Sequence, residues 1–415
     1  MTTTTRSRAA TVRPPLRLRS VRAVWLSWAI VQIFWISILT IARTPTEDIG
    51  YYFRGLHPEL DPHAQLDSTP SLSEYPDAGV WPLRLIDLIT PTNNTAFVIG
   101  FVATIVALSA AFLAFLIYLG RRSSAAGSLD APTYWIFFSA AAGPILLTRL
   151  DLYPGLLVAL TVAFLFTRPR VASALLGLAT MSKLWPGVLA AALVGKWNNR
   201  STWTRLIWFA LSVVVTAGIT IATSGFERLT SPLSYQGDRG LQVESIAATP
   251  LTLANSFNKD GWVIEYAASK SYEIFGPGVS AGIVVSNALM LATLALALGV
   301  ACVRFVRGGW TPDKAASFFL LLVVLLIVSN KVFSPQYLTW FGPLLAVVLA
   351  VIPTHGLGKI PRVAIIIAAM TTLLYPFLYS QLVFGPNPVV AFILAARNVL
   401  MIYLAFLCGR LALRR

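Results

Sequence analysis

The stretch AVWLSWAIVQIFWISILTIA, residues 23–42, decides the class of fold. It carries no charge and has about the 20 residues that a helix needs to cross a bilayer. Arg43 follows it, rather than a small-residue cleavage site, so the run is expected to be a retained helix and not a signal peptide. Because basic residues stay in the cytoplasm, the six arginines before it place the tail 1–22 inside and residue 44 onwards outside. These six are Arg6, Arg8, Arg13, Arg17, Arg19 and Arg22.

The composition indicates an integral membrane protein. Hydrophobic residues make up 56% of the 415 residues and charged residues 12%, with a mean hydropathy of +0.72. Soluble proteins carry about twice that share of charge. The net charge of +15 does not indicate nucleic-acid binding, because the basic residues are scattered between apolar runs rather than gathered on one face. Two cysteines, Cys302 and Cys408, argue against a disulfide framework.

Eleven further apolar runs follow the first. Together they predict an all-α integral membrane protein, a single-domain bundle over 23–415 with about 12 transmembrane or re-entrant helices. Several runs are too short to span a bilayer alone, so we expect tilted, broken or re-entrant segments buried in protein. The runs lie near 95–119, 131–148, 152–167, 171–182, 186–195, 206–224, 278–303, 315–330, 338–352, 363–379 and 389–409.

The charges segregate in the way that this topology requires. The tail and the predicted inner loops hold 21 of the 32 Lys and Arg residues. Of the 17 acidic residues, only Asp130 and Asp313 lie on that side. We therefore expect both termini to be cytoplasmic and the acidic segments to face outwards.

Two predicted outer segments, about 44–94 and 225–277, are long enough to build a site. Within the first, residues 80–89 have the spacing of an interfacial helix. Ionised carboxylates at the end of a membrane helix cost several kcal/mol unless they face water or a partner, so they indicate a functional site. The acidic residues of this first segment are Glu47, Asp48, Glu59, Asp61, Asp67, Glu74, Asp77 and Asp87, with Tyr51, Tyr52, His57 and His63 between them.

The acidic segment also carries a resemblance. Glu47-Asp48-Ile49-Gly50-Tyr51-Tyr52, followed by Glu74-Tyr75-Pro76, resembles the opening of the family 87 membrane glycosyltransferases of actinobacteria, within the C-type glycosyltransferase superfamily. Segments 181–186 (MSKLWP), 238–245 (DRGLQVES) and 329–338 (SNKVFSPQYL) are similar to further elements that recur there. The resemblance covers most of residues 20–410. One departure is Asp77, where relatives often show a second proline.

The resemblance implies a C-type glycosyltransferase fold whose outer-face loops form the active site in the plasma membrane. It implies a polyprenyl-phosphate sugar donor, a glycolipid or envelope-glycan acceptor, no cofactor, and a catalytic carboxylate in the first outer loop. Mannose is the sugar expected, as in the phosphatidylinositol-mannoside and lipomannan mannosyltransferases. Arabinofuranose from decaprenyl-phosphate arabinose is the alternative, because the family contains both kinds.

Asp48 is the candidate general base of an inverting transfer, and Glu47 is the second candidate. A carboxylate can take a proton from a sugar hydroxyl within hydrogen-bond reach. Alternatively, either residue caps a short helix or pairs with Arg43 or Arg54.

Positive charge is needed where the phosphate leaves, and three cations at breaks in the apolar pattern are the candidates: Lys183, Arg239 and Lys331. Lys183 is expected to be a cation without a protein partner, which a lipid phosphate would neutralise. The alternative for all three is snorkelling to the interface. Arg149 and Asp151 either extend this rim or form a local ion pair. Arg397 and Asn398 are expected to satisfy a buried backbone break. The sugar and acceptor contacts are assigned to Tyr51, Tyr52, His57, Glu74, Gln242, Glu244, Gln336 and Tyr337.

No metal site is predicted. The spacing of His57, Asp61 and His63 matches no strong metal signature, although Mg²⁺ or Mn²⁺ would need only carboxylates and water. A transporter or flippase of a lipid-linked saccharide is a further alternative, but it would place charges near the bilayer midplane. A non-catalytic assembly partner is the third function class.

Overall fold

The computed structural model describes residues 18, 20–41, 46–60, 72, 74–122, 128–258, 261–352 and 354–414, and most of that length is helical. The helical prediction is thereby confirmed. The departure within these ranges is an antiparallel hairpin of β1 (Val263–Tyr266) and β2 (Tyr272–Phe275). The helices are α1 (Val21–Ile41), α2 (Glu47–Leu56), η2 (Pro58–Leu60), α3 (Asp77–Asp87), α4 (Asn94–Arg122), α5 (Asp130–Thr148), α6 (Leu152–Phe164), α7 (Pro169–Ser182), η3 (Trp185–Leu193), α8 (Arg200–Ser224), α9 (Phe226–Asp238), α10 (Thr249–Phe257), α11 (Val279–Arg307), α12 (Pro312–Val328), η4 (Pro335–Tyr337), α13 (Leu338–Val351), α14 (Thr354–Leu357), α15 (Ile360–Thr372), η5 (Leu373–Leu378), α16 (Tyr379–Val383) and α17 (Pro388–Ala412).

Each predicted apolar run coincides with a helix, although the run near 186–195 is the 3₁₀ segment η3. Among the described residues, six helices are long and apolar enough to cross a membrane. They are α1, α4, α8, α11, the joined stretch Ile360–Val383, and α17. The total of about twelve crossings and the C-type fold stay predictions.

The long helices at the periphery of the bundle point apolar side chains away from the protein. On α11, Val284, Leu291 and Leu298 each expose about two thirds of their surface, and Val214 of α8 does the same. An apolar stripe of this extent would be costly in water, whereas lipid tails match it. These helices therefore form the lipid-facing shell of the bundle.

The short helices lie inside that shell. At 13 and 14 residues, α6 and α13 are too short to span a bilayer alone, and α13 is buried along nearly its whole length. They approach closely at Gly155, where a Cβ would collide with the carbonyl oxygen of Thr339. For α6 and α13, the expectation that the short runs are buried in protein is confirmed.

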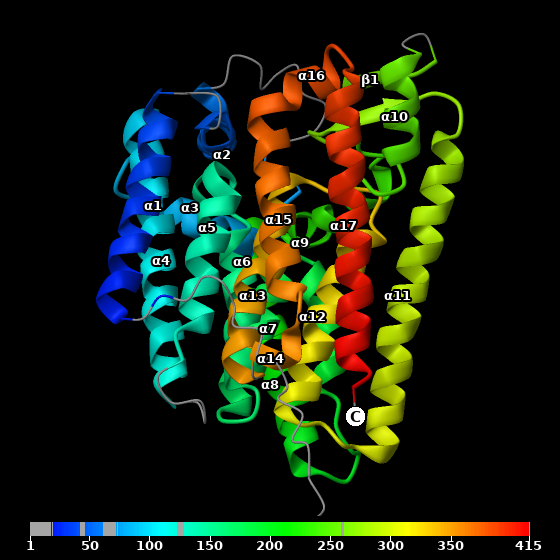
Figure 1. Ribbon diagram of the computed structural model, residues 1–415. Helices are drawn as coiled ribbons and strands as arrows, with labels where there is room; N and C mark the ends of the chain where they lie inside the picture. The colour runs from blue at the N-terminus through cyan, green and yellow to red at the C-terminus, as the bar shows by residue number, and fades with distance from the viewer. Residues whose placement is uncertain are drawn as a thin grey trace, which may run out of the picture.

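Parts of both predicted outer segments lie at one end of the bundle, whereas α3 and α9 of the same segments lie nearer its middle (Figure 1). Figure 1 shows α2, α10, α16 and the hairpin at that end, with the start of α1 and the end of α17 at the other. Arg228 of α9 donates to the carbonyl oxygen of Leu72 over 2.9 Å and so ties the second segment to the first. The predicted interfacial helix is α3, which buries Leu83 and exposes Leu85. We call the end with α2 the site end.

Candidate active site

Glu47 and Asp48 occupy the first turn of α2, where a helix N-terminus favours negative charge. The helix buries Ile49, Tyr52 and Phe53, and this face turns Asp48 towards the bundle while Glu47 remains exposed. Asp48 keeps 23% of its side chain accessible. Of the two predicted carboxylates, Asp48 is therefore the one that belongs to an enclosed site.

Asp48 is held by two residues from distant parts of the chain. Arg149 Nη2 lies 2.6 Å from Asp48 Oδ2, and the hydroxyl of Tyr375 donates to the same oxygen over 2.6 Å. The Arg149 guanidinium also lies over the Tyr375 ring, 5.0 Å from its centroid. Three side chains from α2, the end of α5 and the break after α15 thus form one polar cluster.

Tyrosines connect this cluster to the next one. The hydroxyl of Tyr52 lies 3.4 Å from that of Tyr75 and accepts from the backbone N–H of Leu150, also at 3.4 Å. Burial raises the pKa of the Tyr52 phenol to about 12, although the neighbouring Arg149 charge lowers it. Tyr52 is therefore a neutral structural link with almost no exposed surface, and not an accessible sugar contact in this conformation.

The expectation that Lys183 has no protein partner is wrong. Its Nζ lies 2.8 Å and 3.0 Å from the two carboxylate oxygens of Asp151, which is fully buried and also accepts from Trp340 Nε1 over 2.9 Å. The Lys183 charge lies 4.5 Å from the centroid of the Tyr75 ring. A buried carboxylate needs such donors. The main role of the Lys183 charge in this pair is therefore to neutralise Asp151. The residues Tyr75, Gly79, Leu150, Asp151, Pro154, Ser182 and Lys183 line a small pocket here.

Glu74 and Arg239 add a third carboxylate and a third cation to the site end. The Tyr51 hydroxyl donates to both carboxylate oxygens of Glu74, at 2.9 Å and 3.0 Å. Burial raises the pKa of Glu74, while Lys183 and Arg239 are close enough to oppose that shift. Arg239 lies over the ring of Tyr235, and its buried Nε has no hydrogen-bond partner among the described residues. Arg239 thus keeps a buried donor that no described residue uses.

The segment after α12 contains three of the predicted site residues, Lys331, Gln336 and Tyr337. Lys331 Nζ donates to the carbonyl oxygen of Gly237 over 3.2 Å. Gln336 is half-buried, whereas Tyr337 is buried and stacks on Trp340 with ring centroids 3.8 Å apart. Gln242 Oε1 accepts from the backbone N–H of Phe333 over 2.7 Å, so this predicted sugar contact ties two chain segments together instead.

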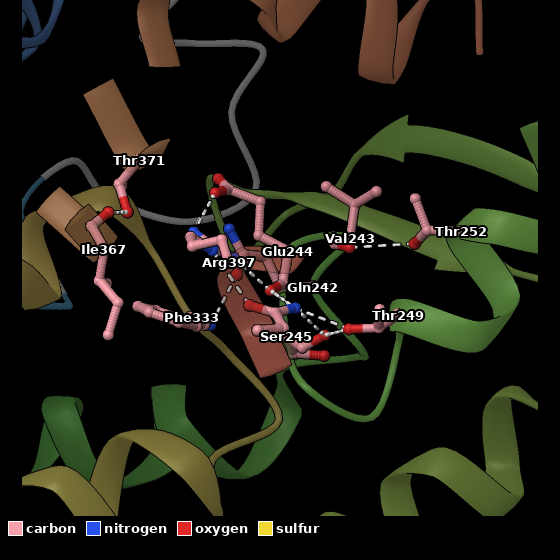
Figure 2. Close-up of polar contacts among 11 residues, drawn as sticks. Gln242, Val243, Glu244, Ser245, Thr249, Thr252, Phe333, Ile367, Thr371 and Arg397 are labelled. Carbon is pink, nitrogen blue, oxygen red and sulfur yellow. Dashed lines mark hydrogen bonds and ion pairs between the residues drawn. The ribbon is translucent and has the colours of Figure 1, made fainter. Parts of the chain in front are cut away.

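Glu244, another predicted sugar contact, has no exposed surface. Its carboxylate lies 2.9 Å from Arg397 Nη1, and its backbone oxygen accepts from Arg397 Nη2 and Asn398 Nδ2 at 2.8 Å and 3.1 Å (Figure 2). The guanidinium lies 4.0 Å from the centroid of the Phe333 ring. The expectation that Arg397 and Asn398 satisfy a buried backbone break is confirmed. Glu244 holds this backbone break against α17. Because it is fully buried, it is not accessible to a ligand in this conformation.

These clusters bring carboxylates, cations and aromatic rings together at the site end of a membrane bundle. The sequence model of glycosyltransferase family 87 matches residues 80–335, which is more than half of the chain. The chain belongs to glycosyltransferase family 87. No curated protein and no solved structure matches it.

Family 87 membership makes this protein a membrane glycosyltransferase that uses a sugar donor and an acceptor. The matched range contains Arg149, Lys183 and Arg239. Asp48 precedes that range and Tyr375 follows it, so the family match by itself assigns neither residue.

His57 of the glycosyltransferase lies apart from these clusters. Its two ring nitrogens contact Asp87 at 2.8 Å and Glu59 at 3.0 Å. The hydrogen bond to Asp87 raises the pKa of His57, so this link stabilises the fold below the ordinary histidine pKa and weakens as pH rises. Within the described residues no group of three His, Cys, Asp or Glu side chains is arranged to hold a metal. Asp61 and His63 lie outside those residues.

Sequence reasoning missed one residue of the candidate site, Tyr375, and the partners of two others. Arg149 and Asp151 were visible as charges between apolar runs, but their partners prove to be Asp48 and Lys183 rather than each other. Tyr375 gave a weaker signal, a tyrosine before a proline within an apolar run. Proline after a helical residue predicts a break, although not what the break would contact.

Proposed function

We propose that the protein transfers mannose from a polyprenyl-phosphate donor to a hydroxyl of a glycolipid or envelope glycan at the outer face of the plasma membrane. The observation that carries the proposal is Asp48, a partly accessible carboxylate held by Arg149 and Tyr375 at the site end. Family 87 membership supports the glycosyl transfer itself. The bundle would have the C-type glycosyltransferase fold in a single domain, with both termini in the cytoplasm.

In the proposed mechanism, Asp48 takes the proton of the acceptor hydroxyl as its oxygen attacks the anomeric carbon. The bond between that carbon and the phosphate oxygen breaks, and polyprenyl phosphate leaves with the electron pair. Attack from the face opposite the leaving group inverts the anomeric configuration. Because Arg149 and Tyr375 both contact Oδ2, we assign the proton transfer to Oδ1.

Arg239 is the first candidate for the phosphate, with Lys183 and Lys331 near the same end. The Arg239 side chain has a buried N–H without a partner among the described residues, whereas Lys183 is already paired with Asp151. A planar guanidinium also matches two phosphate oxygens better than an ammonium does. The predicted sugar and acceptor contacts that keep an accessible surface are Tyr51, His57, Glu74 and Gln336.

The test of function is sugar transfer by the purified protein in detergent. We expect product from polyprenyl-phosphate mannose and a glycolipid acceptor, and none from decaprenyl-phosphate arabinose. Detergent removes the sealed compartment that a transporter or flippase needs, so turnover there separates an enzyme from those classes. Product from the arabinose donor alone would replace the sugar, and no product from either donor would refute a polyprenyl-phosphate-dependent transfer to that acceptor.

Replacing Arg239 with Gln is expected to raise the KM for the donor about tenfold or more. A hydrogen bond between ions is worth about 1.5–3 kcal/mol, and 1.4 kcal/mol corresponds to a factor of ten. Steady-state kinetics with varied donor and then varied acceptor give the two KM values. The matched control is Arg54→Gln, an exposed arginine of α2. An unchanged donor KM in a folded Arg239→Gln variant would remove this residue from the phosphate site.

A further inference from the structure

A helix break directly after α15 places Tyr375 in the site. The α-helix ends at Thr372, and Tyr375 has φ −121° and ψ 121°, which is extended backbone between helical neighbours. Pro376 follows, and a proline disfavours the helical conformation of the residue before it. The sequence Tyr375-Pro376 thus produces the break at the level where the Tyr375 hydroxyl reaches Asp48, 327 residues away along the chain.

The contacts around Asp48 are arranged on one of its two oxygens. Arg149 and Tyr375 both contact Oδ2, each at 2.6 Å, and each also contacts the other through the cation and the ring. Two donors on one oxygen fix the rotation of a carboxylate that a single donor would leave free to turn. Tyr52 lies nearby, and the charges of Arg149 and Asp48 both affect the pKa of its phenol.

We infer that Tyr375 is a positioning residue, whose hydroxyl orients Asp48 so that Oδ1 faces the acceptor hydroxyl. This inference rests on the proposed function, in which Asp48 is the base. Arg149 supplies the opposite charge. Tyr375 supplies a hydrogen bond from a second direction, and two directions are needed to fix the orientation of the carboxylate.

Tyr375→Phe tests the inference, because it removes the hydroxyl and keeps the ring beneath Arg149. We expect kcat to fall about tenfold to a hundredfold, less than the roughly 10²-fold to 10⁴-fold that general-base catalysis contributes, because the base itself remains. Donor and acceptor KM values should change by less than about twofold, since ground-state binding is retained.

Tyr134→Phe is the matched control, since that buried hydroxyl of α5 has no hydrogen-bond partner among the described residues. It should leave kcat unchanged. Losing one half-buried hydroxyl costs about 1 kcal/mol, so Tyr375→Phe is expected to fold, and its thermal midpoint checks this. A folded Tyr375→Phe protein with normal kcat would overturn the inference, as would a lower thermal midpoint with kcat unchanged. If Asp48→Asn is inactive while Tyr375→Phe is normal, only the role of Tyr375 fails; if Asp48→Asn is active, the proposed base fails.

Discussion

Asp48→Asn is expected to lower turnover about 10²-fold to 10⁴-fold. Asparagine keeps the shape of the side chain, and its carbonyl oxygen can still accept from Arg149 and Tyr375, but it cannot take the acceptor proton. Because both short contacts are on Oδ2, an asparagine oxygen in that place leaves each donor with its acceptor. Donor and acceptor binding should be largely retained. Single-turnover measurements with saturating donor and acceptor report the chemical step directly.

Glu47→Gln is the control, because Glu47 sits beside Asp48 in the same helical turn but is exposed. It should reduce turnover far less than Asp48→Asn does. The opposite ranking would move the base to Glu47. Near-normal activity of both variants, at matched expression and thermal stability, would show that the chemistry occurs elsewhere than on α2.

Most of the fold could be predicted from the sequence because hydrophobic runs in a membrane protein are dictated by the thickness of the bilayer. The runs at 131–148 and 338–352 match α5 and α13 within a residue or so. The hairpin of β1 and β2 was not predicted. Its two strands have four residues each, and the sequence around Ser269-Lys270 carries no Asn-Gly or Asp-Gly turn signal.

The site was only partly predictable, because charge pairing over long sequence distances has no local signature. Asp48 stood out through its place after the first helix. Lys183 also stood out, yet the sequence does not reveal that Asp151, 32 residues earlier, would be its partner. Glu244 and Gln242 lie in a polar segment that resembles an exposed loop, whereas the structure packs that segment against α17 and the chain near Phe333.

Replacing Arg397 with Met is expected to destabilise the protein by about 3–5 kcal/mol, the usual cost of removing one partner of a buried ion pair. Arg397 and Glu244 both have fully buried side chains, so the remaining carboxylate would have no water to replace the lost donor. The backbone oxygen of Glu244 would also lose one of its two donors. The thermal midpoint and folded yield of the purified protein measure the effect. Asn398 alone cannot compensate, because its amide already bonds the Glu244 and Ser245 carbonyls and Thr249.

The double variant Glu244→Gln/Arg397→Met separates a lost charge partner from lost packing. It removes the uncompensated charge, so it should recover part of the stability that the single Arg397→Met variant loses. Arg410→Met, an exposed arginine on the same helix, is the control and should change the midpoint little. If Arg397→Met were as stable as Arg410→Met, the Glu244 segment would be held by the hairpin and α10 instead of α17. An unstable single variant with a recovered double variant assigns the ion pair a structural role, because substrate is absent from the measurement.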